Sequence, residues 1–255
     1  MAIPDLLVSV RNLAEARAAV DGGCDRLDVK EPLRGPLGMA DLEVIAEIAA
    51  FSQETQIGDR VPCSVALGEV EEFRQASSPF VLPRGITDIK LGPAETRTRD
   101  GWENGWRLVL DRLEATQLET TRRVAVAYAD WRAAAAPPPE EILSAAIRLG
   151  VDAFLIDTCR KKVGGLPDIM SRQELTRLAA TAHEAGLTFA LAGSLRLPDI
   201  AGLIDIGPDV IAVRGAACHG ESRSADVSSE SVRRLKAEIR ARFGPARKAP
   251  HYARP

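Results

Sequence analysis

The sequence predicts an α/β protein that folds as a single (β/α)8 barrel, the TIM-barrel class. Short apolar runs rich in β-branched residues alternate with longer segments of helical period, which is typical of βαβ units and a parallel sheet. Four of these runs are introduced by a similar phrase of glycine, aspartate and strand, as repeated βα modules would be. A length of 255 residues suits one barrel domain. An open doubly wound sheet is the alternative architecture.

Eight strands can be placed in chain order along the sequence. The predicted strands are 6–10, 26–30, 63–67, 87–91, 124–129, 153–157, 188–193 and 210–215. The repeated glycine and aspartate phrase covers residues 22–30, 85–92, 150–158 and 207–215. In each copy the glycine ends the preceding helix and the aspartate makes the turn into the strand.

The segments between the strands carry helix signals. Asn12 is placed to cap the first helix, and Gly22 or Gly23 to end it. Pro139 suits the first turn of a helix after the proline-rich stretch, and Ser229 is predicted to cap the last helix. The stretch from 69 to 84 shows no clear period and is expected to be irregular.

Composition limits the classes of partner. The chain has 33 basic and 36 acidic residues and a formal charge of −3, which excludes the broad basic surface of unspecific nucleic-acid binding. Small acidic ligands stay compatible with local basic clusters. Neither GxGxxG nor a Walker loop is present, so no nucleotide cofactor is predicted. Residues 1–243 are expected to form the barrel, and the Pro- and Arg-rich residues 244–255 a flexible basic tail.

The cysteines indicate neither a metal site nor a disulfide framework. Cys24, Cys63, Cys159 and Cys218 are far apart, and the chain has only three histidines to accompany them. We expect four reduced, mostly buried thiols and no metal. The N-terminus lacks the pattern of a signal peptide, and no run of about 18 apolar residues occurs. We therefore expect a cytoplasmic protein without a membrane partner.

Lysine is scarce in this chain, since only six of the 33 basic residues are lysines. Lys30 and Lys90 lie at or near the ends of predicted strands, and Lys161 follows the end of another. Barrels of this class carry their catalytic groups at these strand ends. A neutral amine can attack a carbonyl to form a Schiff base, which a guanidinium cannot. We therefore predict catalytic amines here, the alternative being lysines that extend into solvent.

Three carboxylates accompany these lysines. Asp28 precedes Lys30 by two residues, so both side chains share one face of their strand, and Asp88 and Lys90 repeat the spacing. A buried carboxylate beside a buried ammonium lessens the desolvation cost of both. For Asp88, a turn residue at the strand start is an equal alternative. Asp157 ends its strand, where it can position or shuttle protons or, alternatively, cap the next helix.

The last two strands indicate a phosphate site. Gly193 and Ser194 follow one strand, and Arg214 and Gly215 follow the next. Loops after the seventh and eighth strands commonly bind phosphate in such barrels, because glycine lets backbone N–H groups approach an anion. Ser194 and Arg214 could add side-chain donors. Ordinary tight turns are the alternative interpretation.

These motifs together resemble the (5-formylfuran-3-yl)methyl phosphate synthase family of methanofuran biosynthesis. The resemblance rests on the phrases GGCDRLDVK, DIKLG, VAVAYAD, IDT-x-x-K, LAGS and VRGAAC and spans Leu6 to about Glu221. It implies a (β/α)8 barrel that condenses two molecules of glyceraldehyde 3-phosphate into a phosphorylated furan aldehyde, with loss of phosphate and water.

The resemblance also implies roles for individual residues. Lys30 corresponds to the Schiff-base lysine and Lys90 to a proton-transferring lysine, with Asp28, Asp157 and Lys161 as supporting groups. No cofactor is expected, and we expect a small phosphorylated substrate and a homo-oligomer.

The sequence departs from the family pattern in two places. Residues 69–85 are charged and contain proline where the family has small apolar residues, and Arg122 and Arg123 stand where it has a lysine. Two other functions remain open from the residues alone. One is a conventional class I aldolase acting on another phosphorylated aldehyde, and the other is a non-catalytic barrel that binds a sugar phosphate.

Overall fold

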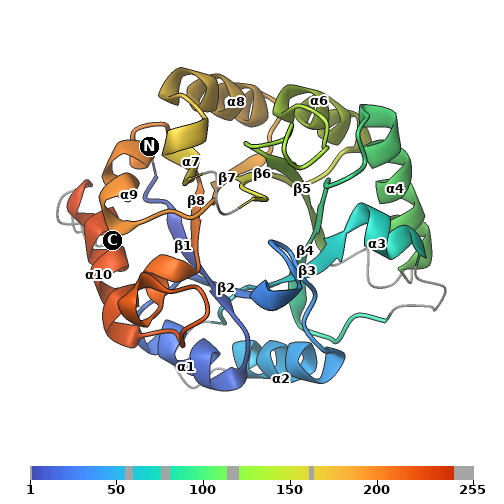
Figure 1. Ribbon diagram of the computed structural model, residues 1–255. Coiled ribbons are helices and arrows are strands. Elements are labelled where there is room, and N and C mark those ends of the chain that lie inside the picture. The colour runs from blue at the N-terminus through green and yellow to red at the C-terminus, as the bar shows by residue number, and fades with distance from the viewer. Residues whose placement is uncertain (1, 55–59, 76–80, 114–120, 161–163, 244–255) are drawn as a thin grey trace, which may run out of the picture.

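Eight parallel strands close into a barrel in the computed structural model of the chain, which describes residues 2–54, 60–75, 81–113, 121–160 and 164–243. The strands pair in chain order, and the last pairs with the first. The helices form a ring outside them (Figure 1). The predicted (β/α)8 barrel is confirmed, and the doubly wound alternative is wrong. Lys161 and the predicted tail 244–255 lie outside the described residues.

All eight predicted strands are present, with boundaries within a few residues of those expected. They are β1 Asp5–Val10, β2 Arg26–Val29, β3 Cys63–Glu69, β4 Ile86–Gly92, β5 Arg122–Tyr128, β6 Ala153–Asp157, β7 Thr188–Leu191 and β8 Val210–Val213. The α-helices are α1 Leu13–Asp21, α2 Leu42–Gln53, α3 Val70–Gln75, α4 Arg99–Arg112, α6 Pro139–Leu149, α7 Leu166–Ile169, α8 Arg172–Glu184, α9 Leu197–Ile204 and α10 Ser229–Ala241. Short 3-10 turns are η1 Pro32–Arg34, η2 Gly215–Ala217 and η3 His219–Glu221.

Alternation along the strands divides the core into two layers. Leu6, Val8 and Val10 of β1 belong to the large cluster between the barrel and the helices, whereas Leu7 belongs to a separate cluster inside the barrel. The inner cluster combines alanines of β3 and β6 to β8 with larger residues such as Tyr128 and Leu155. Because successive strand side chains point to opposite faces, a polar residue on the inner face lies inside the barrel.

Helix ends agree with the sequence in most places. The Asn12 side chain accepts a hydrogen bond from the Glu15 N–H at 2.9 Å, and Gly22 ends α1 as predicted. Pro139 begins α6. The predicted cap at the start of α10 is wrong by one residue, because Ser228 rather than Ser229 accepts from the Ser231 N–H.

The stretch predicted to be irregular contains a helix. Glu69 is the last residue of β3, and Val70–Gln75 form α3 directly after it. The Glu72 carboxylate accepts from the Glu69 N–H at 3.0 Å, which stabilises the start of this short helix. Val70 packs against α4 at Gly105, where a Cβ would lie 1.9 Å from the valine Cγ1. Packing against α4, rather than periodicity, explains why the helix forms here.

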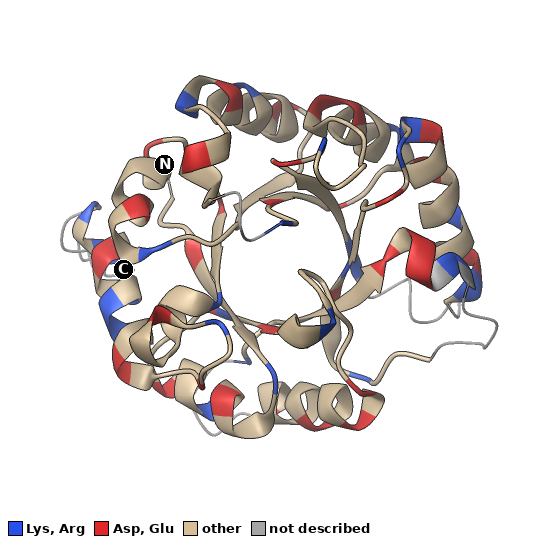
Figure 2. Cartoon of the chain, viewed as in Figure 1, with Lys and Arg blue, Asp and Glu red and all other residues tan. Residues whose placement is uncertain are grey.

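The surface and the thiols agree with the sequence predictions. The four cysteines form no disulfide, and Cys24, Cys63 and Cys218 are buried. Burial raises the pKa of the Cys24 and Cys63 thiols to about 12. Acidic and basic residues are interspersed along the outer helices (Figure 2). Within the described part of the chain, no helix has the length and apolar character needed to span a membrane.

Candidate active site

A cavity of about 190 Å³ opens at the C-terminal end of the barrel. It brings together residues from β1, β2, β4, β6 and the loops after β7 and β8. Eight of the nine predicted site residues line it; these are Asp28, Lys30, Lys90, Asp157, Gly193, Ser194, Arg214 and Gly215. The ninth, Lys161, lies outside the described residues.

A buried ion pair forms the floor of the cavity. The Lys90 ammonium donates to the Asp28 carboxylate at 2.8 Å, and their side chains are 5% and 2% exposed. The Ser9 and Ser64 hydroxyls donate to the same carboxylate at 2.9 and 2.8 Å. Burial alone would raise the pKa of Asp28, but the ammonium groups of Lys90 and Lys30 and the Ser64 hydroxyl hold it below its ordinary value.

Lys30 follows the end of β2 and lines the same cavity as this pair. Its backbone N–H donates to the Val10 carbonyl at 3.1 Å, which continues the β1–β2 ladder. Its side chain is only partly exposed and lies with Asp28 and Lys90 in the cavity wall. Asp28 and Lys30 therefore share one face of the strand, as their spacing predicted, and the structure shows that this face is the inner one. The ammonium hydrogen-bonded to Asp28 is that of Lys90, two strands away on β4.

Asp88 is not the partner of Lys90. It lies two residues earlier on β4, nearer the N-terminal end of the barrel, and is 6% exposed. Its carboxylate lies 3.3 Å from the Arg122 guanidinium and 3.7 Å from that of Arg26. Both alternatives for Asp88 are therefore partly right, since it points inward but pairs with arginines at the strand starts. The arginine at position 122 thus faces the end of the barrel opposite the cavity.

Asp157 ends β6 and lines the cavity, with an exposed fraction of 3%. One carboxylate oxygen accepts from the Thr158 N–H at 2.7 Å. The next described helix, α7, begins only at Leu166 and has Gly165 as its N-cap. Asp157 therefore does not cap α7, and its carboxylate belongs to the site region rather than to a helix start.

The turn after β7 has the geometry of an anion-binding loop. Gly193 has a φ of 101°, and a Cβ there would lie 2.8 Å from the Thr158 Cγ2, so only glycine fits. Ser194 has a φ of 52° and is exposed in the cavity mouth. Within the described residues, the N–H groups of Ser194 and Gly215 meet no protein acceptor. These donors can therefore bind a phosphate group.

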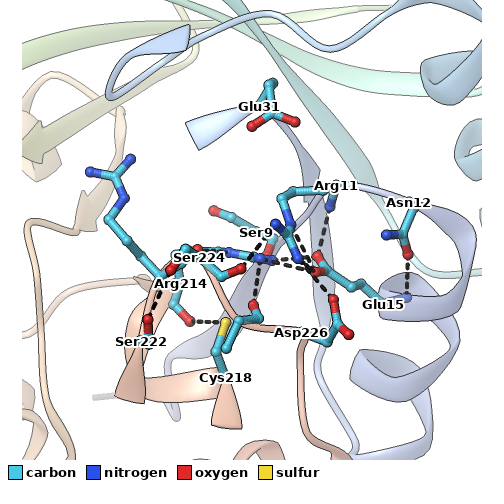
Figure 3. Close-up of polar contacts among 12 residues, drawn as sticks. Ser9, Arg11, Asn12, Glu15, Glu31, Arg214, Cys218, Ser222, Ser224 and Asp226 are labelled. Carbon is cyan, nitrogen blue, oxygen red and sulfur yellow. Dashed lines mark hydrogen bonds and ion pairs between the residues drawn. The ribbon is translucent and has the colours of Figure 1, made fainter. Parts of the chain in front are cut away.

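The guanidinium of Arg214 is already fully bonded to the protein (Figure 3). It forms a buried, bidentate ion pair with Glu15 of α1, and it also donates to the carbonyls of Ser9, Arg223 and Ala225. These bonds use all five of its N–H groups. The predicted side-chain contact from Arg214 to phosphate has no donor left, so the structure assigns this residue to positioning the loop instead.

A half-buried glutamate hydrogen-bonded to a buried tyrosine was missed by the sequence reasoning. The Tyr128 hydroxyl donates to Glu69 at 2.6 Å, and Ala94 N–H donates to the other oxygen at 2.9 Å. Burial raises the pKa of Glu69 to about 6, against the opposing effect of Tyr128. Tyr128 pairs in register with Asp157. Among the described side chains, no three His, Cys, Asp or Glu groups form an arrangement that could hold a metal ion.

Glu69 could have been found by the rule that located Lys30. It is the polar residue that closes its strand, but the predicted strand ended at residue 67, two residues too early. A Cβ at Gly92 of the neighbouring strand would lie 2.0 Å from a Glu69 carboxylate oxygen, so the carboxylate fits only because that residue is glycine.

The closed barrel and the lysine and carboxylate groups at its C-terminal end define a (β/α)8-barrel enzyme. The model of the 4-HFC-P synthase family matches residues 6–236. The (5-formylfuran-3-yl)methyl phosphate synthase of Methanosarcina barkeri is 32% identical over 241 residues, covering 92% of this chain and 99% of that protein. The protein of that name from Methanopyrus kandleri is 34% identical, covering 91% and 97%. The chain therefore belongs to the 4-HFC-P synthase family.

Solved structures agree with the fold at low sequence identity. Phosphoribosyl anthranilate isomerase of Thermotoga maritima aligns with a TM-score of 0.59 and 13% identity, covering 93% of this chain and 99% of that one. KGPDC from Streptococcus mutans aligns with a TM-score of 0.55 and 14% identity, covering 95% and 100%. At these identities the likeness concerns the barrel alone.

Proposed function

We propose that this enzyme condenses two molecules of glyceraldehyde 3-phosphate into (5-formylfuran-3-yl)methyl phosphate, a step of methanofuran biosynthesis. The reaction releases phosphate and water. The observation that carries the proposal is the convergence of Lys30, Lys90, Asp28 and Asp157 on one cavity beside a glycine turn with open N–H groups. Membership of the 4-HFC-P synthase family supports the same product.

Lys30 is the amine that attacks the aldehyde carbon. It lines the cavity at the end of β2, and a second ammonium, that of Lys90, lies in the same interior. The neutral form of this amine is the nucleophile. Loss of water from the addition product gives the iminium, which withdraws electrons from the neighbouring carbon and makes its proton acidic.

Lys90 and Asp28 hold the proton needed in the following steps. The Lys90 ammonium donates to Asp28, whose other contacts are two serine hydroxyls, so the pair is fixed in position. Asp157 faces the same cavity from β6 and can accept the proton from the carbon next to the iminium. The resulting enamine expels a phosphate group from its neighbouring carbon, which leaves an unsaturated iminium. The enol form of the second molecule adds to the terminal carbon of this iminium, and water then releases the product from Lys30.

The substrate phosphate that is retained binds at the turns after β7 and β8. Ser194 and Gly215 offer backbone N–H groups there, and the Ser194 hydroxyl faces the mouth. Arg214 supports this site from behind, through Glu15 and Ser9. Lys161, the remaining family lysine, is proposed to assist Asp157 in proton transfer. The cytoplasmic location and the homo-oligomer stay predictions.

Product analysis with glyceraldehyde 3-phosphate as the sole substrate tests the proposal. We expect a furan chromophore and released phosphate to appear together, and sodium borohydride to trap an adduct on Lys30 that mass spectrometry locates in its peptide. Lys30→Arg should abolish both. Lys236→Arg is the matched control, because Lys236 pairs with Asp25 on the outer side of the barrel. Turnover without phosphate release would indicate a conventional aldolase, and binding without any adduct or turnover a non-catalytic barrel.

A further inference from the structure

Three arginines line the cavity, and they differ in their partners. Arg214 has every donor bonded to protein. Arg196 is exposed and pairs with Asp199 at 3.4 Å. Arg223 is half-buried, and its guanidinium donates to the carbonyl of Pro32 at 3.1 Å. Among the carboxylates that the structure describes, none forms an ion pair with Arg223, so its remaining donors are available to a ligand.

The contact with Pro32 places the guanidinium across the mouth of the cavity. Arg223 belongs to the loop after β8, whereas Pro32 follows β2 and lies two residues beyond Lys30. The side chain thus extends from the phosphate-binding side of the barrel towards the Schiff-base lysine. Burial lowers the pKa of Arg223 from its ordinary value, the charge of Asp157 opposes this, and the charge of Arg214 adds to it. A bound anion would compensate a cation in this surrounding.

The loop that carries Arg223 is held by a dedicated set of bonds, most of which Figure 3 shows. Arg214 donates to the carbonyls of Arg223 and Ala225 at 3.1 and 3.0 Å. Arg11 donates to the intervening carbonyl of Ser224 at 3.1 Å. Glu15 in turn binds both Arg11 and Arg214. Three successive carbonyls are therefore fixed from below, which leaves the Arg223 side chain directed over the cavity.

From this geometry we infer that Arg223 binds the phosphate group that leaves during the reaction, while the glycine turn binds the one that is retained. This inference rests on the proposed function. A retained phosphate has to stay anchored through carbon–carbon bond formation, which suits the rigid N–H groups of Ser194 and Gly215. A leaving phosphate has to escape, which suits a side chain at the open mouth.

The step is a β-elimination from the Lys30 iminium. A base removes the proton from the carbon next to the iminium carbon, and those electrons form the new carbon–carbon double bond. The adjacent C–O bond breaks, and its electron pair leaves with the phosphate oxygen. The departing group gains negative charge as the bond breaks, so a guanidinium beside it stabilises the transition state more than the bound substrate.

Arg223→Ala and Arg223→Lys separate this role from substrate binding in general. We expect Arg223→Ala to form the borohydride-trapped adduct with glyceraldehyde 3-phosphate but to release phosphate about 10- to 100-fold more slowly, which is the value of one charge-assisted hydrogen bond. Arg223→Lys should recover part of that rate. Arg172→Ala, which removes the same charge from the outer helix α8, should leave the rate unchanged. Arg214 binds residue 223 through its backbone carbonyl alone, so the loop should keep its conformation in both variants.

Phosphate binding distinguishes the failure of this inference from failure of the proposed function. In a calorimetric titration with inorganic phosphate, the wild type should bind two equivalents and Arg223→Ala one, whichever reaction the enzyme performs. Wild-type protein that forms no furan but shows this difference would refute the proposed function alone. Arg223→Ala that binds phosphate and releases it from substrate as the wild type does would overturn the role of Arg223.

Discussion

Removing Lys90 should destabilise the protein, because it leaves Asp28 charged and unpaired inside the barrel. The Asp28 side chain is 2% exposed, and Lys90 is its only ion-pair partner within 4 Å among the described residues. Two serine hydroxyls would remain as donors. Breaking a buried pair by removing one partner costs about 3–5 kcal/mol. The two serine hydroxyls and water from the cavity would still solvate the unpaired carboxylate. The expected loss of stability for Lys90→Met is therefore at the lower end of this range, about 3 kcal/mol.

Asp28→Asn and the double variant complete the measurement. Asp28→Asn leaves the Lys90 ammonium without its ion-pair partner and should likewise cost about 3 kcal/mol. The double variant Asp28→Asn/Lys90→Met leaves neither member of the pair charged, so its loss should be smaller than the sum of the two by about 2 kcal/mol or more. All three variants should lack turnover, because stability returns in the double variant while the proton-transferring amine does not.

Urea denaturation followed by tryptophan fluorescence measures these free energies of unfolding, since Trp102 and Trp106 are both fully buried. A loss below about 1 kcal/mol for Lys90→Met, or single losses that simply add, would refute the view that the pair is mutually dependent. A pH series adds a second check. The pKa of Asp28 is below its ordinary value, so its contribution should be present at neutral pH and be lost as the pH falls below about 4. Asp28→Asn should remove that acid-side loss.

Three further outcomes are expected. Burial raises the pKa of Glu69 from 4.5 to about 6, so the contribution of this carboxyl to stability is lost as the pH rises through 6. Thermal unfolding should therefore show the wild type losing on the order of 2 kcal/mol of stability between pH 4 and 7, relative to Glu69→Gln. Gly193→Ala should raise the KM for substrate about 10-fold or more, because the new Cβ would clash with the Thr158 side chain and residue 193 has a φ of 101°. Gly202→Ala on α9 is the control, since a Cβ there has open space and should leave KM unchanged. Cys159 should react with a thiol reagent before the buried Cys24 and Cys63, as timed absorbance measurements can show.

The architecture could be predicted from local signals because each strand is preceded by its own turn. Glycine and aspartate before strands 26–30 and 153–157 indicated their starts, and the apolar alternation indicated their faces. The shared face of Asp28 and Lys30 followed from their spacing, whereas only the structure shows that this face is the barrel interior. Helix α3 was missed because its stability depends on Glu72 capping Glu69 and on Val70 packing against α4, neither of which leaves a period in the sequence.

The partners within the site could not be read from spacing. Lys90 shares a strand with Asp88, yet it pairs with Asp28, because closure of the barrel and the register of β2 to β4 bring those two side chains together. Arg214 was expected to face substrate on the strength of its glycine neighbour. Its true partner, Glu15, is 199 residues away on the first helix, and only the contact of β8 with β1 brings them together.

The bond between Glu15 and Arg214 joins the first βα unit of the chain to the last. A shortened chain that ends before β8 would contain Lys30, Lys90 and Asp157 but would lack both Arg214 and the loop that it holds. The proposed catalytic amines and the proposed phosphate site therefore become one site only when the ring closes. Chain synthesis delivers these parts in order, so under the proposed function a nascent or truncated barrel would carry the Schiff-base lysine without the means to retain a phosphorylated aldehyde. Activity would then begin with the docking of the final unit.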